Sequence, residues 1–434
     1  MTRRLLPLLL AAVLTCAGCW DLVAVDQLAI VGSIGLDEVT PGKILVSLEI
    51  INPQALATGT ALAATPAPIS AWVLREEADS IPAALANIQR RTPRSLFVGQ
   101  ANTVIFGQEL AREGVRDHLD YLAREFFLRR SVFVNTCDTS AGLLQRPFML
   151  LLPSLTLGGL ALHAPASGMT SPTTLNEFLR KLAEPGIEPV TTHTAGRKTH
   201  DVVVKLPGEE AKQDKPAIQR EQPLESERNI PGELPDEHPA LDPLVQGAQG
   251  EPLPGMTFLV GIAAYRGDRL VGFLDGPDAR GYLWAVGQLQ EAVLQVPAPG
   301  GTPGIVSLDV TDATVALRCV QSGGGLPRIS LKLRANLQLS SAPGGLATQN
   351  LQRELEQAAA NLISAEVRRV LQLVQGELKT DIYGFGNLIY RKRPKVWQRY
   401  SADWNERWFP QLQVDVSVTA TLANSGAVVR HPRR

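Results

Sequence analysis

The sequence predicts an α+β protein of two to three domains, with mixed sheets that are mostly antiparallel. Segments in which apolar and polar residues alternate recur in both halves of the chain, which is typical of strands with one buried face. Helical periodicity separates some of these segments and is clearest at residues 351–375. A chain of 434 residues is also too long for one small core. We therefore expect a C-terminal domain with one long helix packed on an antiparallel sheet.

Residues 1–18 are predicted to form a signal peptide. Two arginines precede an apolar run of ten residues, which is shorter than the roughly 20 residues that a membrane-spanning helix needs. Two small residues then precede Cys19, as in a bacterial lipobox, so we expect Cys19 to carry a lipid and to begin the mature chain. Cys16 stands where Leu is common and is an alternative acceptor. Ordinary secretion with cleavage nearby is the other interpretation.

An N-terminal domain is expected over residues 19–200, in which residues 140–200 could form a small subdomain. Ser80 is expected to cap a helix, and Thr174 and Glu177 form a capping box for a later one. The predicted order is β-β-β-α-β-α-β, with strands at 28–37, 43–51 and 69–74, a helix at 80–91, a strand at 96–106, a helix at 108–126 and a strand at 128–134.

A C-terminal domain is expected over residues 256–434. Pro277 begins a predicted helix, and Glu366 and Arg369 are spaced for an ion pair on the surface of the long helix. The predicted strands lie at 257–265, 269–274, 292–296, 305–308, 314–320, 329–339 and 412–422, and a second helix is expected to contain Trp397, Tyr400, Trp404 and Trp408.

Residues 201–255 are predicted to link the two domains. Most of this segment, residues 207–255, holds nine prolines, eleven acidic residues and no aromatic one, so it cannot bury enough apolar area to offset chain ordering. We interpret it as a solvated tether, with an acidic docking segment as the alternative. The whole chain has 42 basic and 43 acidic residues, which gives no reason to expect a nucleic-acid partner. Cys137 and Cys319 could form a disulfide or remain two buried thiols.

The residues indicate no cofactor and no metal centre, because neither His-Glu-x-x-His nor Cys-x-x-Cys spacing occurs. Asp275 and Arg280 could act as an acid–base pair; the alternative is a turn aspartate that caps the next helix and an arginine that supports packing. Gly384 and Gly386 are expected to let the backbone turn tightly rather than to bind a nucleotide. The aromatic and basic run 391–409 could belong to the core or contact lipid headgroups.

Several motifs resemble the C subunits of spore nutrient-germinant receptors, in order and over nearly the whole mature chain. They are Gly18-Cys19-Trp20-Asp21, residues 28–37, Ile50-Ile51-Asn52-Pro53, residues 101–114, Gly272-Phe273-Leu274-Asp275-Gly276, Arg280-Gly281-Tyr282-Leu283-Trp284, Asp381-Ile382-Tyr383-Gly384-Phe385-Gly386 and residues 391–397. Residues 207–255 look longer and more polar than the join usual in this family. The motif positions with a possible structural role are Asp275, Gly276, Arg280, Trp284, Gly384 and Gly386.

The resemblance implies a lipid-anchored, non-enzymatic receptor subunit on the outer face of the spore inner membrane. Proteins of this family act with two multi-pass membrane subunits in nutrient-triggered germination. Two other classes stay open from the residues alone. A substrate-binding lipoprotein that delivers a small ligand to a membrane transporter would need a two-lobed cleft with a hinge. An exported hydrolase would need clustered acid and base groups in a pocket.

Overall fold

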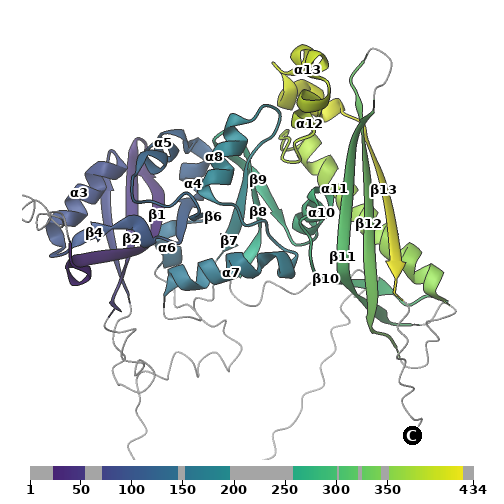
Figure 1. Cartoon of the computed structure of the whole chain (residues 1–434), viewed down its shortest axis with the longest axis horizontal. Helices are drawn as coiled ribbons and strands as arrows, with labels where there is room; N and C mark the ends of the chain where they lie inside the picture. Colours follow the sequence, from purple (N-terminus) through teal and green to yellow (C-terminus); the bar gives the residue numbers. More distant parts are fainter. Residues whose placement is uncertain are drawn as a thin grey trace, which may run out of the picture.

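The computed structural model describes residues 23–53, 71–144, 152–195, 258–300, 303–320, 325–343 and 351–423. The predicted signal peptide, Cys16, Cys19 and the linker at 201–255 lie outside these residues. Two sheets stand side by side, each with its own helices (Figure 1). The sheets are mixed and mostly antiparallel, so the predicted α+β class is confirmed.

The first sheet has nine strands within the described residues, in the order β3-β2-β1-β5-β6-β7-β8-β9, with β4 also paired to β1. Its centre is parallel, because β1, β5, β6 and β7 run in the same direction, and both flanks are antiparallel. The strands are β1 (Leu28–Thr40), β2 (Lys43–Ile51), β3 (Ala71–Ala78), β4 (Ser95–Phe97), β5 (Thr103–Gly107), β6 (Phe133–Cys137), β7 (Val190–Ala195), β8 (Phe258–Arg266) and β9 (Arg269–Asp275).

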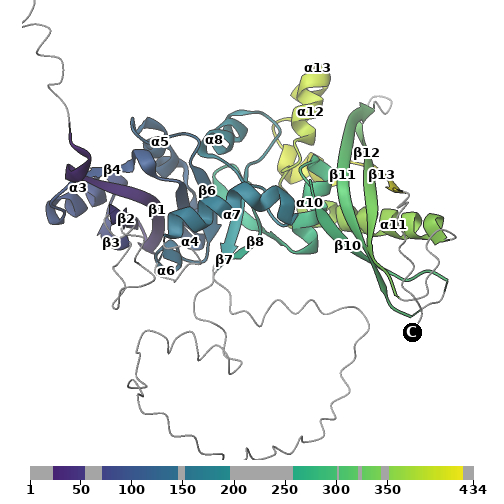
Figure 2. The ribbon, with the colours of Figure 1, turned by 60° about the horizontal axis from the view of Figure 1, so that its bottom comes forward.

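Helices pack on this sheet and close its core. Ser80 caps the first of them and Thr174 forms the predicted capping box with Glu177, so both cap predictions are confirmed. Figure 2 shows one helix, α7, lying across the sheet. The helices are α3 (Ile81–Arg91), α4 (Gln108–Glu113), α5 (Arg116–Arg124), α6 (Ser140–Leu144), α7 (Pro153–Ser167) and α8 (Leu175–Ala183), with a 3-10 turn η1 at Val25–Gln27 and another, η3, at Val98–Gln100.

The second sheet has the order β10-β11-β12-β13, and the long helix α11 packs on it as predicted. Its first two pairings are antiparallel, whereas β12 and β13 are parallel. The elements are α10 (Pro277–Val286), β10 (Ala292–Pro297), β11 (Ile305–Val320), β12 (Arg328–Ser341), α11 (Gln352–Gly376), α12 (Phe385–Lys392), α13 (Pro394–Tyr400), the π turn η7 (Trp404–Trp408), the 3-10 turn η8 (Phe409–Gln411) and β13 (Val414–Leu422).

Strands β8 and β9 follow the predicted linker and were expected in the C-terminal domain, yet they complete the first sheet. Their alternating residues serve two cores. Ile262 and Ala264 belong to the core under the second sheet, while Ala263 and Tyr265 belong to the core of the first. The two sheets therefore share these strands as a common wall. The domain limits remain a prediction.

Several predicted elements have different limits in the structure. The strand expected at 96–106 is divided by the turn η3, and the helix expected at 108–126 breaks at Gly114, whose φ of 129° is incompatible with a helix. The strands expected at 305–308 and 314–320 are one continuous strand, β11. The aromatic helix expected through Trp397 and Trp408 consists of α13 and the π turn η7.

Candidate functional site at the sheet junction

The family-like motif near residue 381 forms a cage of donors around one buried carboxylate. Asp381 is fully buried and accepts hydrogen bonds from the backbone N–H groups of Gly384 (2.9 Å), Phe385 (3.1 Å) and Gly386 (2.7 Å). The indole Nε1 of Trp404 donates a fourth, at 2.9 Å. Burial raises the pKa of Asp381 to about 6, against the opposing effect of these donors. The backbone N–H groups of the motif are thus directed at the Asp381 carboxylate and fix a tight turn.

The two glycines of this motif are required for different reasons. Gly384 has a φ of 75°, a left-handed conformation that side chains disfavour. Gly386 is needed for space, since a Cβ there would lie 2.7 Å from Nε1 of Trp404. The predicted tight turn is confirmed. On the opposite side, a Cβ on Gly186 would lie 2.5 Å from the carbonyl carbon of Gly386, so the two backbones touch.

Glu188 connects this cage to the first sheet. Its backbone N–H donates to the carbonyl oxygen of Asp381 at 3.0 Å. Its carboxylate accepts from the backbone N–H of Gly267 at 2.5 Å, in the β8–β9 turn, and from Nδ2 of Asn405 at 2.6 Å. Burial raises the pKa of Glu188. Thr380 adds a hydrogen bond from its hydroxyl to the carbonyl oxygen of Tyr265, at 2.5 Å. We call Asp381, Glu188, Gly267, Asn405 and Thr380 the junction cluster.

Arg280 and Trp284 form a second buried arrangement, between α10 and α11. Arg280 donates from Nε to Glu366 at 3.0 Å and makes a further contact through Nη2, while Nε1 of Trp284 donates to the same carboxylate at 3.2 Å. The predicted surface pair of Glu366 with Arg369 is therefore wrong. Glu366 points inward because α10 supplies these donors, and Arg369 instead pairs with Asp278 at 2.8 Å.

Asp275 and Arg280 do not meet, so the structure does not bring together the predicted acid–base pair. Asp275 lies at the end of β9, where its Oδ1 is 2.9 Å from Nδ1 of His193. The ring of His193 stacks on Phe273 with centroids 3.9 Å apart. Asp275 does not cap α10 either: the N-cap is Gly276, whose φ is 53°. Arg280 supports packing, in accord with the structural alternative.

The two cysteines lie apart from the junction cluster, whereas Trp404 contacts it through its hydrogen bond to Asp381. Cys137 is buried in β6 and Cys319 is partly exposed in β11, without a disulfide between them. Trp397 and Trp404 pack against each other in the core, with centroids 5.1 Å apart. Within the part of the chain that is described, no group of three or more His, Cys, Asp or Glu side chains is placed to hold a metal, and no helix has the length and apolar content to cross a membrane.

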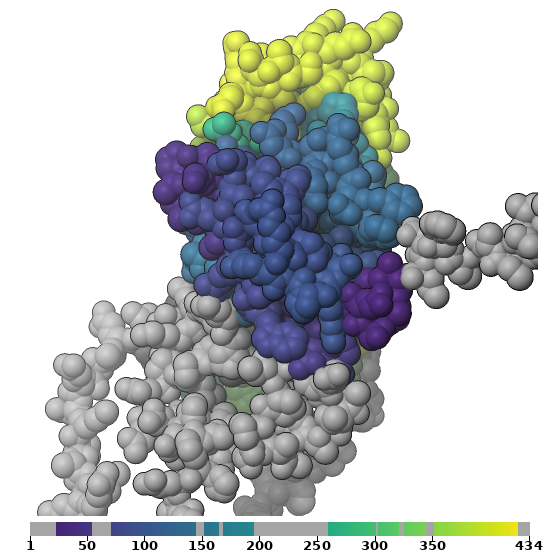
Figure 3. Space-filling view, turned by 90° about the vertical axis from the view of Figure 1, so that its left-hand side faces the viewer, coloured from purple at the N-terminus to yellow at the C-terminus, as the bar shows by residue number. Residues whose placement is uncertain are grey.

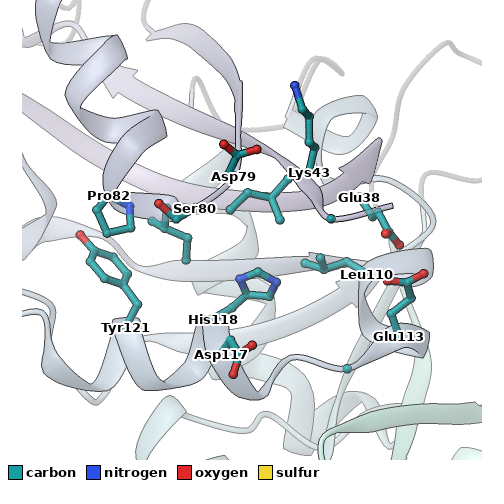
Figure 4. A pocket seen from close by; sticks show the side chains of 14 residues that line it. Glu38, Lys43, Asp79, Ser80, Pro82, Leu110, Glu113, Asp117, His118 and Tyr121 are labelled. Atoms are coloured by element: carbon teal, nitrogen blue, oxygen red, sulfur yellow. The ribbon is translucent and has the colours of Figure 1, made fainter. Parts of the chain in front are cut away.

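An open hollow of about 380 Å³ lies on the N-terminal part of the molecule (Figure 4). Acidic side chains dominate its rim, among them Glu38 and Glu113, and His118 lies on its floor. Burial raises the pKa of Glu38, and the nearby Glu113 carboxyl adds to this rise; burial lowers the pKa of His118. The lining residues all fall within positions 38–121, so this hollow is not a cleft between two lobes.

The fold and the junction define a two-sheet α+β protein whose buried charged groups hold its halves together. Residues 21–194 match the family described as "Spore germination protein N-terminal domain", and residues 260–426 match "Spore germination B3/ GerAC like, C-terminal". The chain belongs to this family, the C-subunit family of spore nutrient-germinant receptors.

Individual relatives agree with this assignment. The chain is 23% identical to Spore germination protein KC of Bacillus subtilis over 429 residues, which cover 96% of this chain and 95% of that protein. It is 21% identical to Spore germination protein B3 of the same organism over 187 residues, covering 43% and 49% of the two chains. The crystal structure of the GerBC protein has the same fold, with a TM-score of 0.51 and 14% identity over 90% of this chain and 97% of that one.

Sequence reasoning listed Asp275, Gly276, Arg280, Trp284, Gly384 and Gly386 as structural motif positions. The structure places Gly384 and Gly386 in the Asp381 cage, Arg280 and Trp284 against Glu366, Asp275 against His193 and Gly276 at the N-cap of α10. Sequence reasoning did not identify Glu188, Asn405 or the partner of Asp275. Their partners are between 24 and 217 positions away in the chain, and no local spacing signals such contacts.

Proposed function

We propose that this chain is the lipid-anchored, non-enzymatic subunit of a germinant receptor, held through Cys19 on the extracytoplasmic face of the spore inner membrane. The observation that carries the proposal is the family match, whose two parts cover residues 21–194, directly after the lipobox-like segment, and residues 260–426. Two acyl chains on one cysteine would anchor the chain durably, since each buried methylene contributes about 0.8 kcal/mol.

The non-enzymatic part of the proposal is supported by how the buried charged groups are used. Asp381 is saturated by four donors, and Glu366 by Arg280 and Trp284. Groups that are held in this way cannot exchange protons with a substrate without breaking the contacts that fix the fold. Their role is to hold the two sheets in a fixed relative position, so that each can present a surface to a partner protein.

The proposed partners are two multi-pass membrane subunits of the same receptor. A lipid anchor would confine this chain to the membrane that holds these subunits, and this raises the effective concentration at which they meet. Genes encoding two multi-pass membrane proteins next to the gene for this chain would support this arrangement.

The anchor is tested by Cys19→Ala, with Cys16→Ala as the matched control in the same segment. We expect Cys19→Ala to move the folded chain from the membrane pellet to the soluble fraction and Cys16→Ala to leave it in the pellet. Mass spectrometry of the amino-terminal peptide should find a diacylated Cys19 in the parent chain. Acylation of Cys16, or a pelleted Cys19→Ala chain with no other lipid, would contradict the proposal.

A further inference from the structure

An exposed aromatic and basic surface lies at one edge of the first sheet. Phe126 and Phe127 follow α5 and are 89% and 57% exposed, which is unusual for side chains of this size. Phe127 contacts Phe97 with ring centroids 5.7 Å apart, and Phe126 contacts Phe127 at 5.2 Å. Arg129 and Arg130 follow in the same loop, after the buried Leu128, and are exposed. We call the three phenylalanines and the two arginines the aromatic edge.

The aromatic edge lies where the chain emerges from the predicted anchor. Phe97 is the register partner of Ile30 in the parallel pairing of β4 with β1. The described chain begins seven residues earlier, at Val23, and Val25 is 71% exposed. Cys19 precedes Val23 by four residues, a reach of at most about 14 Å. Figure 3 shows the dark purple start of the chain against the blue segments of this end of the molecule.

The topology places other residues at the same edge. β1, β5 and β6 are parallel, and Ser33, Thr103 and Phe133 lie in one row of the sheet. The segments that precede β5 and β6 therefore all project from the amino-terminal edge of these strands. A shallow hollow of about 310 Å³ lies there as well, lined by Arg129 and by exposed Leu155 and Leu162 of α7.

The charges at this edge are available to an external anion. Arg129 donates only to the side-chain oxygen of Gln100 and Arg130 only to the carbonyl oxygen of Ala123, both at 3.4 Å, and neither forms a salt bridge with a described residue. The acidic residue of the loop, Glu125, is engaged by the hydroxyl of Tyr121 at 3.1 Å. Exposed aromatic rings with free guanidinium groups beside them suit the headgroup region of an anionic membrane.

We propose that the aromatic edge is a second, direct contact with the anionic membrane surface, with Phe126 and Phe127 inserted among the lipid headgroups. The proposal rests on the proposed function for placing the chain at a membrane. Contact at the anchor and at this edge fixes the orientation of the first sheet relative to the bilayer. The second sheet, which lies at the far end of the molecule, is then held away from the lipid (Figure 1).

The first experiment uses a chain that starts at residue 20, which keeps all the described cores and has no acyl group. It is sedimented with vesicles of phosphatidylcholine alone, or of phosphatidylcholine and phosphatidylglycerol in equal amounts. We expect binding to the anionic vesicles only. Changing Phe126 and Phe127 together to Ser should weaken it at least about tenfold, and Arg129→Gln or Arg130→Gln by about fivefold each.

The matched control changes Val293→Ser and Val320→Ser, which are 55% and 48% exposed on the second sheet and should leave vesicle binding unchanged. Phe126→Ser alone should also weaken binding, and it should not affect folding, because the ring of Phe126 is almost fully exposed. Equal binding by all variants, or no binding to anionic vesicles, would overturn the proposal.

The second experiment uses the acylated full chain and separates the edge from the anchor. An environment-sensitive fluorophore is attached at Phe126→Cys or Val320→Cys in a Cys319→Ser background and the chain is placed in the anionic vesicles. We expect a blue shift of emission at position 126 and none at 320. No shift at 126 on a chain with acylated Cys19 would overturn the inference and leave the anchor intact. A shift that needs the multi-pass subunits would also overturn it, by assigning the edge to a protein partner.

Discussion

Asp381 shows how one buried carboxylate fixes the start of a helix. The N-cap Gly384 and the first two residues of α12 present backbone N–H groups that have no partner within the helix, and the Asp381 carboxylate accepts all three. An amide side chain at this position offers one acceptor oxygen, not two, and an NH₂ group that faces donors. The cost of such a mismatch in a buried site is about 1–3 kcal/mol for each unsatisfied donor.

Asp381→Asn is expected to destabilise the chain and to alter its pH dependence. The folded pKa of about 6 is above the unfolded value of 3.8, so the folded state holds the proton more tightly between these values. By linkage, the stability that the parent derives from this group is complete below pH 3.8 and declines as the pH rises to about 6. The difference in unfolding free energy between parent and variant should therefore narrow over this range.

Denaturant titrations at several pH values measure this difference directly. The control is Asp403→Asn, which changes an exposed carboxylate that does not hydrogen bond to Asp381. Asn405→Asp would be unsuitable, because Asn405 belongs to the junction cluster. If the difference in unfolding free energy between parent and variant instead widens as the pH rises, the pKa of Asp381 is lowered in the folded state, and the prediction is wrong.

At the residue scale, sequence alone identified which positions carry motifs but not what they contact. Gly384 and Gly386 were expected to support a tight turn, and the positive φ of Gly384 and the close packing at Gly386 agree with this. Glu366 was expected on a helix surface because i,i+3 spacing suggested Arg369 as its partner. Its real partner, Arg280, belongs to another helix 86 positions away, and this kind of contact is invisible to local periodicity.

Among the elements, the 185–189 loop and the start of α12 approach each other backbone to backbone. Gly186 has a φ of 73° and faces the backbone of Gly386 and Asn387. The backbone N–H of Asn387 donates to the carbonyl oxygen of Gly186 at 2.7 Å, so the two segments are hydrogen bonded as well as in contact. Neither segment can retreat without losing this bond.

Gly186→Ala is expected to lower the unfolding free energy by about 2–4 kcal/mol, because strain at positive φ adds to a backbone clash. Gly267→Ala is the matched control. Its φ is 61° but its Cβ would meet nothing within 4 Å, so only the conformational cost of about 1 kcal/mol applies. Thermal or denaturant unfolding of both variants measures the difference. Equal losses would show that the close approach contributes nothing.

Element types were predicted well where the periodicity was long, as in α11, and poorly where a short turn interrupts an apolar run. The helix expected at 108–126 ends at Gly114 because the following residues turn toward the β8–β9 hairpin, where Val115 donates to the carbonyl oxygen of Asp268 at 3.0 Å. That partner follows the predicted linker in the chain. The end of this helix therefore depends on a contact with a residue more than 150 positions away, which the local sequence does not indicate.

Considered as a whole, the molecule is unified by strands β8 and β9 and by the junction cluster. The alternating faces of β8 supply residues to both cores, and Glu188 accepts hydrogen bonds from both sides of the junction. Sequence analysis assigned these strands to the C-terminal domain because they follow the linker. Strand pairing is a property of the folded chain, and the order of strands in a sheet cannot be read from their order in sequence.

Glu188→Ala is expected to lower the unfolding free energy by about 2–4 kcal/mol, since it leaves the buried donors of Gly267 and Asn405 without an acceptor. Hydrogen exchange should quicken at residues 266–268 and 380–387 together, while the β11–β12 pairing stays protected. Glu406→Ala is the control, because it removes only the exposed pair with Arg266, worth less than about 1 kcal/mol. Faster exchange in only one of these two segments would contradict the role of Glu188 in coupling them.

The pairing of β7 with β8 has a consequence for how this chain can diverge. Ala195 and Phe258 are register partners, so the ends of the intervening stretch are already clasped together by the sheet. Each doubling of the length between two such fixed points adds only about 0.6 kcal/mol of closure entropy. Evolution can therefore lengthen, shorten or rewrite residues 196–257 almost freely, and an engineer could graft a reporter domain there while the architecture on either side stays unchanged.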